Sequence, residues 1–247
     1  MNKKPIIAGN WKMNKLPSEI KIYTDTVLGL VGHVKSVSVI FAPPFTGLFE
    51  MSLEPPFYSA AQNCHWEDSG AFTGEISINM IKDLSVSYVI VGHSERRQVF
   101  NESDDWINKK VRSVLTNDLK VILCIGETSN ERKSFETEKV IKSQIEKGLK
   151  NISNISNVII AYEPVWAIGT GDTASARQIE AAHSFIRKTI NDNYDKRNDI
   201  HILYGGSVNS TNAKELIQID GVDGFLIGGA SLDANSFASI IKTVDLV

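Results

Sequence analysis

Eight short runs of apolar, often β-branched residues recur along the chain, with few polar residues inside them. They occupy Pro5–Trp11, Val37–Ala42, Phe57–Gln62, Tyr88–Gly92, Lys120–Ile125, Val158–Tyr162, Ile200–Tyr204 and Gly224–Ile227. Runs that are apolar at successive positions are typical of parallel strands buried on both faces. The pattern therefore predicts eight buried strands.

Amphipathic segments lie between these runs. In Glu131–Leu149, apolar residues such as Phe135, Ile141 and Ile145 recur close to a helical repeat, with lysines and glutamates elsewhere. The segment Ser175–Ile190 has the same character. We expect one helix over each segment.

The alternation of strands and helices decides the fold class. Such units place their strands in parallel and connect them by right-handed crossovers. A closed (β/α)₈ barrel typically needs about 250 residues, and this chain has 247. Because no linker-like or low-complexity stretch divides the sequence, we predict a single α/β domain over residues 1–247, a barrel of eight parallel strands. An open doubly wound sheet is the alternative.

Composition narrows the function classes. A formal net charge of −3 and the lack of a basic stripe argue against nucleic-acid binding. No apolar run is long enough to span a membrane, and no signal-peptide pattern is visible. The two cysteines, Cys64 and Cys124, fit a reducing compartment. We expect a cytoplasmic protein that binds neither membranes nor nucleic acids.

In a barrel the active site lies at the carboxyl ends of the strands, and an acidic residue stands at one of them. Glu163 directly follows the apolar run that ends at Tyr162. A carboxylate that loses water at such a position becomes a better proton acceptor. The apolar loop that follows, with Pro164 at its entry and Trp166 within it, suggests a lid that excludes water. Glu163 lies too far upstream to cap the helix expected near Ser175.

Two further strand ends carry candidate chemistry. Asn10 and Lys12 are two positions apart, so we expect both side chains on the same side of the first strand. A lysine at the mouth of an apolar barrel is costly unless it meets an anion; a solvated lysine is the alternative.

Among the five histidines, His93 ends the fourth strand where a short helix is expected. A helix N-terminus disfavours positive charge, so the His93 imidazole should be neutral and able to donate a hydrogen bond.

Glycine pairs end the last two strands, as Gly205-Gly206 followed by Ser207 and as Gly228-Gly229. Glycine lets a ligand approach the backbone closely. Loops after strands seven and eight form a recurrent phosphate site in barrels. Two such pairs at adjacent strand ends predict a phosphate-binding site.

Together these residues resemble the triosephosphate isomerase family, and the resemblance covers the whole chain. The segment Ala161–Gly171 is close to diagnostic, and the segments 8–14, 91–97, 204–207 and 224–231 carry further motifs. The resemblance implies a TIM barrel. It also implies a role for each matching residue: Glu163 as catalytic base, His93 as electrophile, Lys12 as a catalytic and substrate-binding residue, Asn10 and Trp11 as substrate-binding residues, and Gly171, Ser207, Gly228 and Gly229 as phosphate contacts. Asp172 departs from the lysine common in the family, which bears on lid kinetics and not on the chemistry.

The resemblance further implies an activity and a partner. The enzyme would interconvert dihydroxyacetone phosphate and glyceraldehyde 3-phosphate in glycolysis and gluconeogenesis, with no cofactor and no metal ion. It would be a homodimer in which loop 63–75 enters the partner and places Thr73 near the partner's Asn10 and the partner's Lys12. Because the net charge is negative, Lys12 and backbone donors would have to attract the anionic substrate. The alternatives are another phosphate-binding barrel isomerase or synthase, and a barrel scaffold without catalysis; neither explains the joint presence of Asn10, Lys12, His93 and Glu163.

Overall fold

The computed structural model describes residues 3–168, 173–194 and 199–247, and eight strands form one closed barrel. The strands are β1 (Ile6–Asn10), β2 (Ser38–Ala42), β3 (Phe57–Ala61), β4 (Tyr88–Val91), β5 (Lys120–Ile125), β6 (Val158–Tyr162), β7 (Ile202–Tyr204) and β8 (Gly224–Ile227). Each strand pairs in parallel with the next, and β8 pairs in parallel with β1. The predicted (β/α)₈ TIM barrel is confirmed, and the open doubly wound sheet is wrong.

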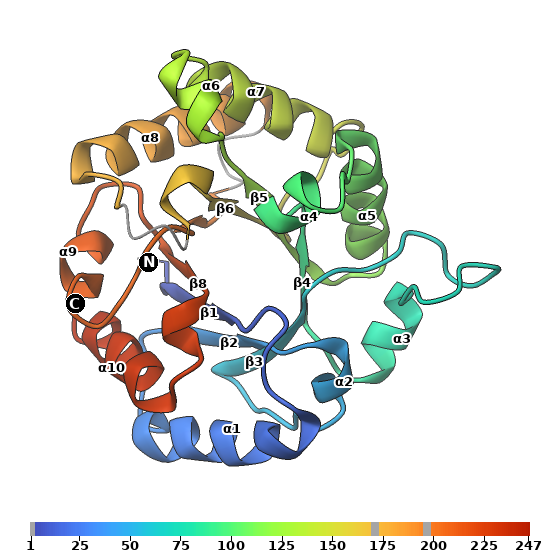
Figure 1. Ribbon diagram of the computed structural model, residues 1–247, viewed down its shortest axis with the longest axis vertical. Coiled ribbons are helices and arrows are strands. Elements are labelled where there is room, and N and C mark those ends of the chain that lie inside the picture. The colour runs from blue at the N-terminus through green and yellow to red at the C-terminus, as the bar shows by residue number, and fades with distance from the viewer. Residues whose placement is uncertain (1–2, 169–172, 195–198) are drawn as a thin grey trace.

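Helices surround the barrel and connect successive strands (Figure 1). They are α1 (Pro17–Val31), α2 (Phe45–Leu48), α3 (Ile78–Asp83), α4 (Ser94–Gln98), α5 (Asp104–Thr116), α6 (Ser129–Lys133), α7 (Thr137–Gly148), α8 (Ala176–Asn193), α9 (Ala213–Ile217) and α10 (Ala234–Asp245), with short 3₁₀ helices η1 (Val165–Ala167) and η2 (Gly229–Ser231). Within the described ranges, no helix combines the length and the apolar character that a membrane span requires.

Alternate residues of each strand belong to two hydrophobic layers, which explains why the strands lack a polar face. In β1, Ile6 and Ala8 pack inside the barrel, whereas Ile7 packs outward toward the helices. In β5, Ile122 and Val121 divide in the same way. Both layers exclude water, so each strand is apolar at successive positions.

The helix predicted over Glu131–Leu149 is wrong in its first turns. The chain forms two helices there, α6 and α7, and Phe135 between them has a positive φ of 58° and is 96 % exposed. The buried face of α7 begins only with Ile141 and Ile145, which lie four residues apart. Phe135 is six residues before Ile141 and so is out of phase with this face.

The helix start expected near Ser175 is right, because the Ser175 hydroxyl accepts a hydrogen bond from the Gln178 N–H and caps α8.

Candidate active site

A cavity of about 320 Å³ opens at the carboxyl end of the barrel. Its lining contains most of the residues predicted from the sequence, namely Asn10, Lys12, His93, Glu163, Ser207, Gly228 and Gly229. Residues contributed by β1, β4, β6, β7 and β8, or by the loops that follow them, thus meet in one place. Gly171, the remaining predicted phosphate contact, and Asp172 lie outside the described residues.

Glu163 is held at the cavity wall directly after β6, with 2 % of its surface exposed. Its Oε2 accepts a hydrogen bond of 2.9 Å from the Ser94 N–H at the start of α4. Its own N–H donates to the Ile125 carbonyl at 2.7 Å. A Cβ at Gly205 would lie 2.9 Å from Cγ of Glu163, so glycine is needed beside this carboxylate. Backbone and side chain are therefore both fixed in position.

The His93 ring has one defined proton arrangement when neutral. Its Nδ1 accepts a hydrogen bond of 3.2 Å from the Glu95 N–H, which places the ring proton on Nε2. Nε2 lies 3.1 Å from Oε1 of Glu163 and can donate to it. His93 also stands at the N-cap of α4, as predicted. The geometry thus suits a neutral hydrogen-bond donor next to a carboxylate.

Asn10 and Lys12 both line the cavity, but the reason expected from the sequence is wrong. β1 ends at Asn10, and Lys12 has a positive φ of 53°, so the two do not share a strand face. The Asn10 Oδ1 instead accepts a hydrogen bond of 3.1 Å from the Lys12 N–H and holds the turn. Nζ of Lys12 forms an ion pair of 2.7 Å with Oε1 of Glu95. This carboxylate supplies an anion to the lysine at the barrel mouth and offsets the cost of its position.

The side chain of Trp11 lies elsewhere. It is fully buried and packs edge-on against Tyr23 at 4.7 Å and Phe41 at 6.3 Å between ring centroids. It is absent from the cavity lining. The structure therefore does not support a substrate contact through the Trp11 ring, since the residue after β1 turns outward into the core between the barrel and α1.

The glycine pairs line the cavity beside Lys12. A Cβ at Gly228 would lie 3.4 Å from Cε and 3.7 Å from Nζ of Lys12, so this backbone and the ammonium group are neighbours. A Cβ at Gly229 would have no heavy atom within 4 Å, which shows that this position faces open space. A cation next to accessible backbone suits an anionic group such as a phosphate.

The segment after Glu163 is tied down at its base. The Trp166 Nε1–H donates to Oε1 of Glu127 at 2.9 Å, and the Ser207 hydroxyl donates to the Ala167 carbonyl at 2.9 Å. Val165–Ala167 forms the 3₁₀ turn η1, and Ile168 reaches the cavity lining. The segment therefore links the carboxylate at the end of β6 to the side of the cavity where Ser207 lies.

Two carboxylates that the sequence patterns did not reveal support this arrangement. Glu95 pairs with Lys12, and Glu127 is a fully buried carboxylate that binds Tyr162, Trp166 and Arg132. Glu127 stands just after β5, so the rule that found Glu163 also applies to it. Glu95 lies within α4, where a charged side chain gives no signal in the sequence pattern.

Comparison with known proteins decides the family. The sequence profile of triosephosphate isomerases matches residues 5–244. The chain is 45 % identical to the triosephosphate isomerase of Chloroherpeton thalassium over 251 residues, which covers 98 % of this chain and 100 % of the relative. It is 47 % identical to that of Endomicrobium trichonymphae over 246 residues, covering 97 % and 98 %. The chain belongs to the triosephosphate isomerase family.

Membership in the triosephosphate isomerase family confirms the predicted enzyme class, an isomerase. It also decides against the two alternatives, a barrel from another phosphate-binding family and a scaffold without catalysis. The match to the family extends over nearly the whole chain. It therefore includes every strand whose carboxyl end borders the cavity.

Proposed function

We propose that the protein interconverts dihydroxyacetone phosphate and glyceraldehyde 3-phosphate by proton transfer through an enediolate, with Glu163 as the base. The observation that carries this proposal is the 3.1 Å approach of His93 Nε2 to Glu163 Oε1 in a cavity that Lys12 also lines. A carboxylate base, a neutral donor and a cation are what enolisation of a carbonyl compound needs. The pairing of a glutamate base with a neutral histidine is the known arrangement of triosephosphate isomerases, so the division of roles follows the family resemblance.

The reaction divides between the residues as follows. Glu163 removes a proton from the carbon next to the carbonyl, while Nε2–H of His93 donates to the carbonyl oxygen and stabilises its growing negative charge. His93 then moves protons between the two oxygens of the enediolate. Glu163 returns its proton to the neighbouring carbon, which converts ketone to aldehyde without a net change in oxidation state. Lys12 stabilises the negative charge, and Asn10 orients the oxygens.

The phosphate of the substrate would lie against Gly228, Gly229 and Ser207, with Gly171 closing over it. Support comes from the Lys12 ammonium, which adjoins Gly228, and from the open space at Gly229. A bound phosphate far from the reacting carbons supplies binding energy that fixes the substrate geometry. The segment that begins at Pro164 would act as the lid and exclude water.

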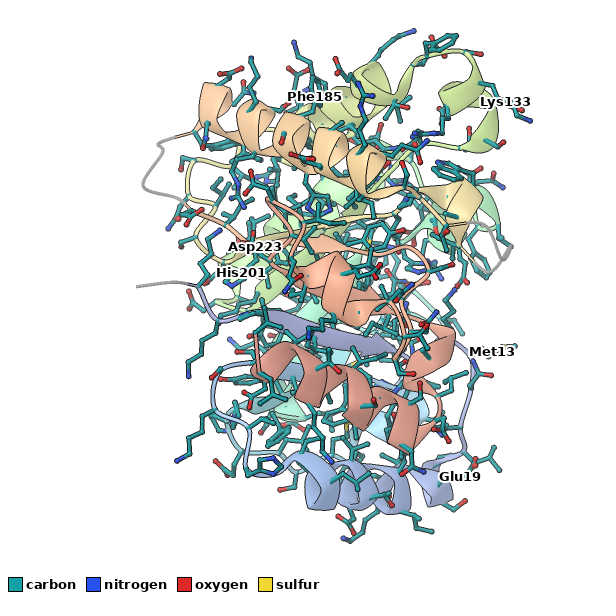
Figure 2. The ribbon with its side chains drawn as sticks, turned by 90° about the vertical axis from the view of Figure 1, so that its left-hand side faces the viewer. Met13, Glu19, Lys133, Phe185, His201 and Asp223 are labelled. Carbon is teal, nitrogen blue, oxygen red and sulfur yellow. The ribbon has the colours of Figure 1, made fainter. Side chains whose placement is uncertain are left out.

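We further propose a homodimer through loop 63–75. This loop connects β3 to α3 and extends outward beyond the ring of helices (Figure 1). Its Phe72 is 43 % exposed although it packs on His65, and Met13, beside the active-site lysine, is 95 % exposed. Met13 lies at the opposite end of the barrel from His201 and Asp223 (Figure 2). A second copy that covers Met13 with its own loop would bury both apolar side chains and border the cavity.

The setting of the activity is glycolysis and gluconeogenesis in the cytoplasm. Both cysteines, Cys64 and Cys124, are free and buried, which fits a compartment that keeps thiols reduced. Burial raises the pKa of the Cys64 thiol to about 12, so it stays protonated and unreactive at neutral pH.

The test is a coupled assay of both reaction directions in the presence of a metal chelator, run on the wild-type protein and on Glu163→Gln. We expect full activity with the chelator and a loss of several orders of magnitude in the variant. The reaction should also be run in D₂O, because proton transfer through solvent-exchanging groups introduces deuterium at the carbon next to the carbonyl. Activity that disappears with the chelator, or a wild-type protein without activity, would refute the proposal.

A further inference from the structure

The segment that carries the glycine pair after β8 is anchored from behind by a tyrosine of α1. The Tyr23 hydroxyl donates a hydrogen bond to the backbone carbonyl of Ser231, the last residue of η2. Both residues are buried, with Tyr23 6 % exposed and Ser231 fully covered. Tyr23 is separated from Ser231 by 208 positions in the sequence, so this contact joins the first helix to the last strand–helix connection.

The carbonyl of Ser231 needs such a donor. The last carbonyl groups of a helix have no partner within the helix, and a buried carbonyl without a donor is costly. Burial raises the pKa of the Tyr23 hydroxyl, and the nearby Asp233 carboxylate raises it further. The hydroxyl therefore remains protonated across the physiological range, and it is the donor in this contact because the carbonyl oxygen can only accept.

Ser231 is tightly enclosed on its other sides as well. Its hydroxyl donates to the Gly228 carbonyl at 2.7 Å, which closes the turn on itself. A Cβ at Gly9 would lie 2.9 Å from Cβ of Ser231, so β1 directly supports η2. Tyr23 completes this enclosure from α1, and the Trp11 ring packs against it at 4.7 Å. The position of Trp11 is thus explained as packing behind the anchor.

The anchored segment faces the cavity with its two glycines. Gly228 and Gly229 line the cavity, and glycine loses more conformational freedom on ordering than any other residue. A segment with two successive glycines can turn its N–H groups in several directions unless its ends are held. The β8 end is held by the barrel, and the other end is held at Ser231.

We propose that Tyr23 is a positioning residue that orients the backbone N–H groups of residues 228–230 toward the substrate phosphate. Tyr23 does not touch substrate, and its effect passes through the Ser231 carbonyl. This inference rests on the proposed function, since it assigns the phosphate to these glycines. It predicts that loss of the hydroxyl weakens binding of the phosphate group and leaves the proton-transfer residues intact.

The experiment uses Tyr23→Phe, which keeps the ring and removes only the donor. A hydrogen bond of this kind corresponds to about a 3- to 10-fold change in an equilibrium constant. We expect kcat/KM for glyceraldehyde 3-phosphate to fall by this factor and the inhibition constant of inorganic phosphate to rise by the same factor. For glyceraldehyde, which lacks the phosphate, kcat/KM should be unchanged.

Tyr194→Phe is the matched control, because the Tyr194 hydroxyl also donates to a backbone carbonyl, that of Leu149, at 3.1 Å and away from the cavity. It should lower thermal stability without changing any of the three constants. Tyr23→Met is the second variant, since a flexible thioether fills the space without donating a strong hydrogen bond. It should reproduce the effect of Tyr23→Phe on the phosphate-dependent constants.

The outcomes are separable. Unchanged phosphate inhibition in a folded Tyr23→Phe or Tyr23→Met protein would overturn the inference, while wild-type activity would leave the proposed function standing. Equal losses with glyceraldehyde 3-phosphate and with glyceraldehyde would also overturn it, because that result indicates a general disturbance of the barrel. An inactive wild-type protein would instead refute the proposed function.

Discussion

Replacement of Glu163 by aspartate tests the assignment of the base most directly. The change keeps the carboxylate but withdraws it by about 1.5 Å, the length of a carbon–carbon bond. In the native protein, Oε2 accepts from the Ser94 N–H at 2.9 Å and Oε1 lies 3.1 Å from Nε2 of His93. A shift of this size breaks both contacts, because hydrogen bonds weaken steeply beyond their normal range.

The size of the effect follows from this displacement. Misplacement of a reacting group by about 1 Å can cost on the order of 10²-fold in rate, which corresponds to about 2.7 kcal/mol in activation free energy. The loss should appear in kcat for Glu163→Asp. KM should change by less than about 3-fold, since the residues proposed to bind the phosphate are unchanged and uniform binding is retained.

The assay is steady-state kinetics in both directions, with Glu102→Asp as the matched control. Glu102 is also a buried carboxylate, paired with Arg96 and Lys110, but it does not line the cavity. Glu102→Asp should lower the unfolding midpoint and leave kcat within about 2-fold, because it touches no reacting group. If Glu163→Asp has a near-normal kcat while it is folded, Glu163 is not the base.

Three more predictions concern assembly, the lid and acid stability. Thr73→Arg places a charge in the loop proposed to enter the partner, so sedimentation should show a monomer with reduced activity. Thr26→Arg, on the exposed side of α1, should change neither the assembly nor the activity. A fully active monomer would contradict the proposed link between dimer formation and activity. Deletion of residues 168–171, partly outside the described structure, should leave a folded barrel that isomerises poorly and releases more methylglyoxal by phosphate elimination. NMR measures the ratio of methylglyoxal to isomerised product. An unchanged ratio would mean that the segment is no lid. Burial lowers the pKa of His183 from 6.5 to about 4, so the unfolded chain binds a proton at higher pH than the folded one. The free energy of unfolding should therefore decrease by on the order of 3 kcal/mol between about pH 6.5 and pH 4. In urea unfolding, this free energy should change less steeply with pH in His183→Gln than in the control His33→Gln, an exposed site.

The barrel was predictable because each strand is buried on both faces. Ile6, Ile7 and Ala8 face alternate hydrophobic layers, so a continuous apolar run was the correct signal. The break at Phe135 was not predictable from the same signal. A phenylalanine on an expected apolar face is normally interpreted as a core residue. Only the structure shows that Phe135 has a positive φ and that its side chain points into solvent.

The cavity lining is predictable where a residue type and a strand end coincide, as for His93 and Glu163. For Lys12 the predicted place in the cavity is right but the predicted reason is wrong, since its place depends on a left-handed backbone conformation after β1 rather than on strand alternation. Its partner Glu95 gives no signal in the sequence, because one glutamate in a short charged helix resembles a solvated residue. Long-range contacts such as that of Tyr23 with Ser231 leave no trace in local sequence patterns.

The pair Glu127 and Glu163 shows why a strand end alone does not identify a base. Both carboxylates are buried just beyond adjacent strands, β5 and β6. The oxygens of Glu127 are occupied by the Tyr162 hydroxyl, the Trp166 indole and the Arg132 guanidinium, which neutralises the charge. Glu163 instead faces a cavity and a histidine donor, with no arginine or lysine paired to it among the described contacts. Glu127 is thus held on several sides by its neighbours, whereas Glu163, the proposed base, faces the cavity, so it is the set of partners, and not the position in the chain, that distinguishes the two glutamates.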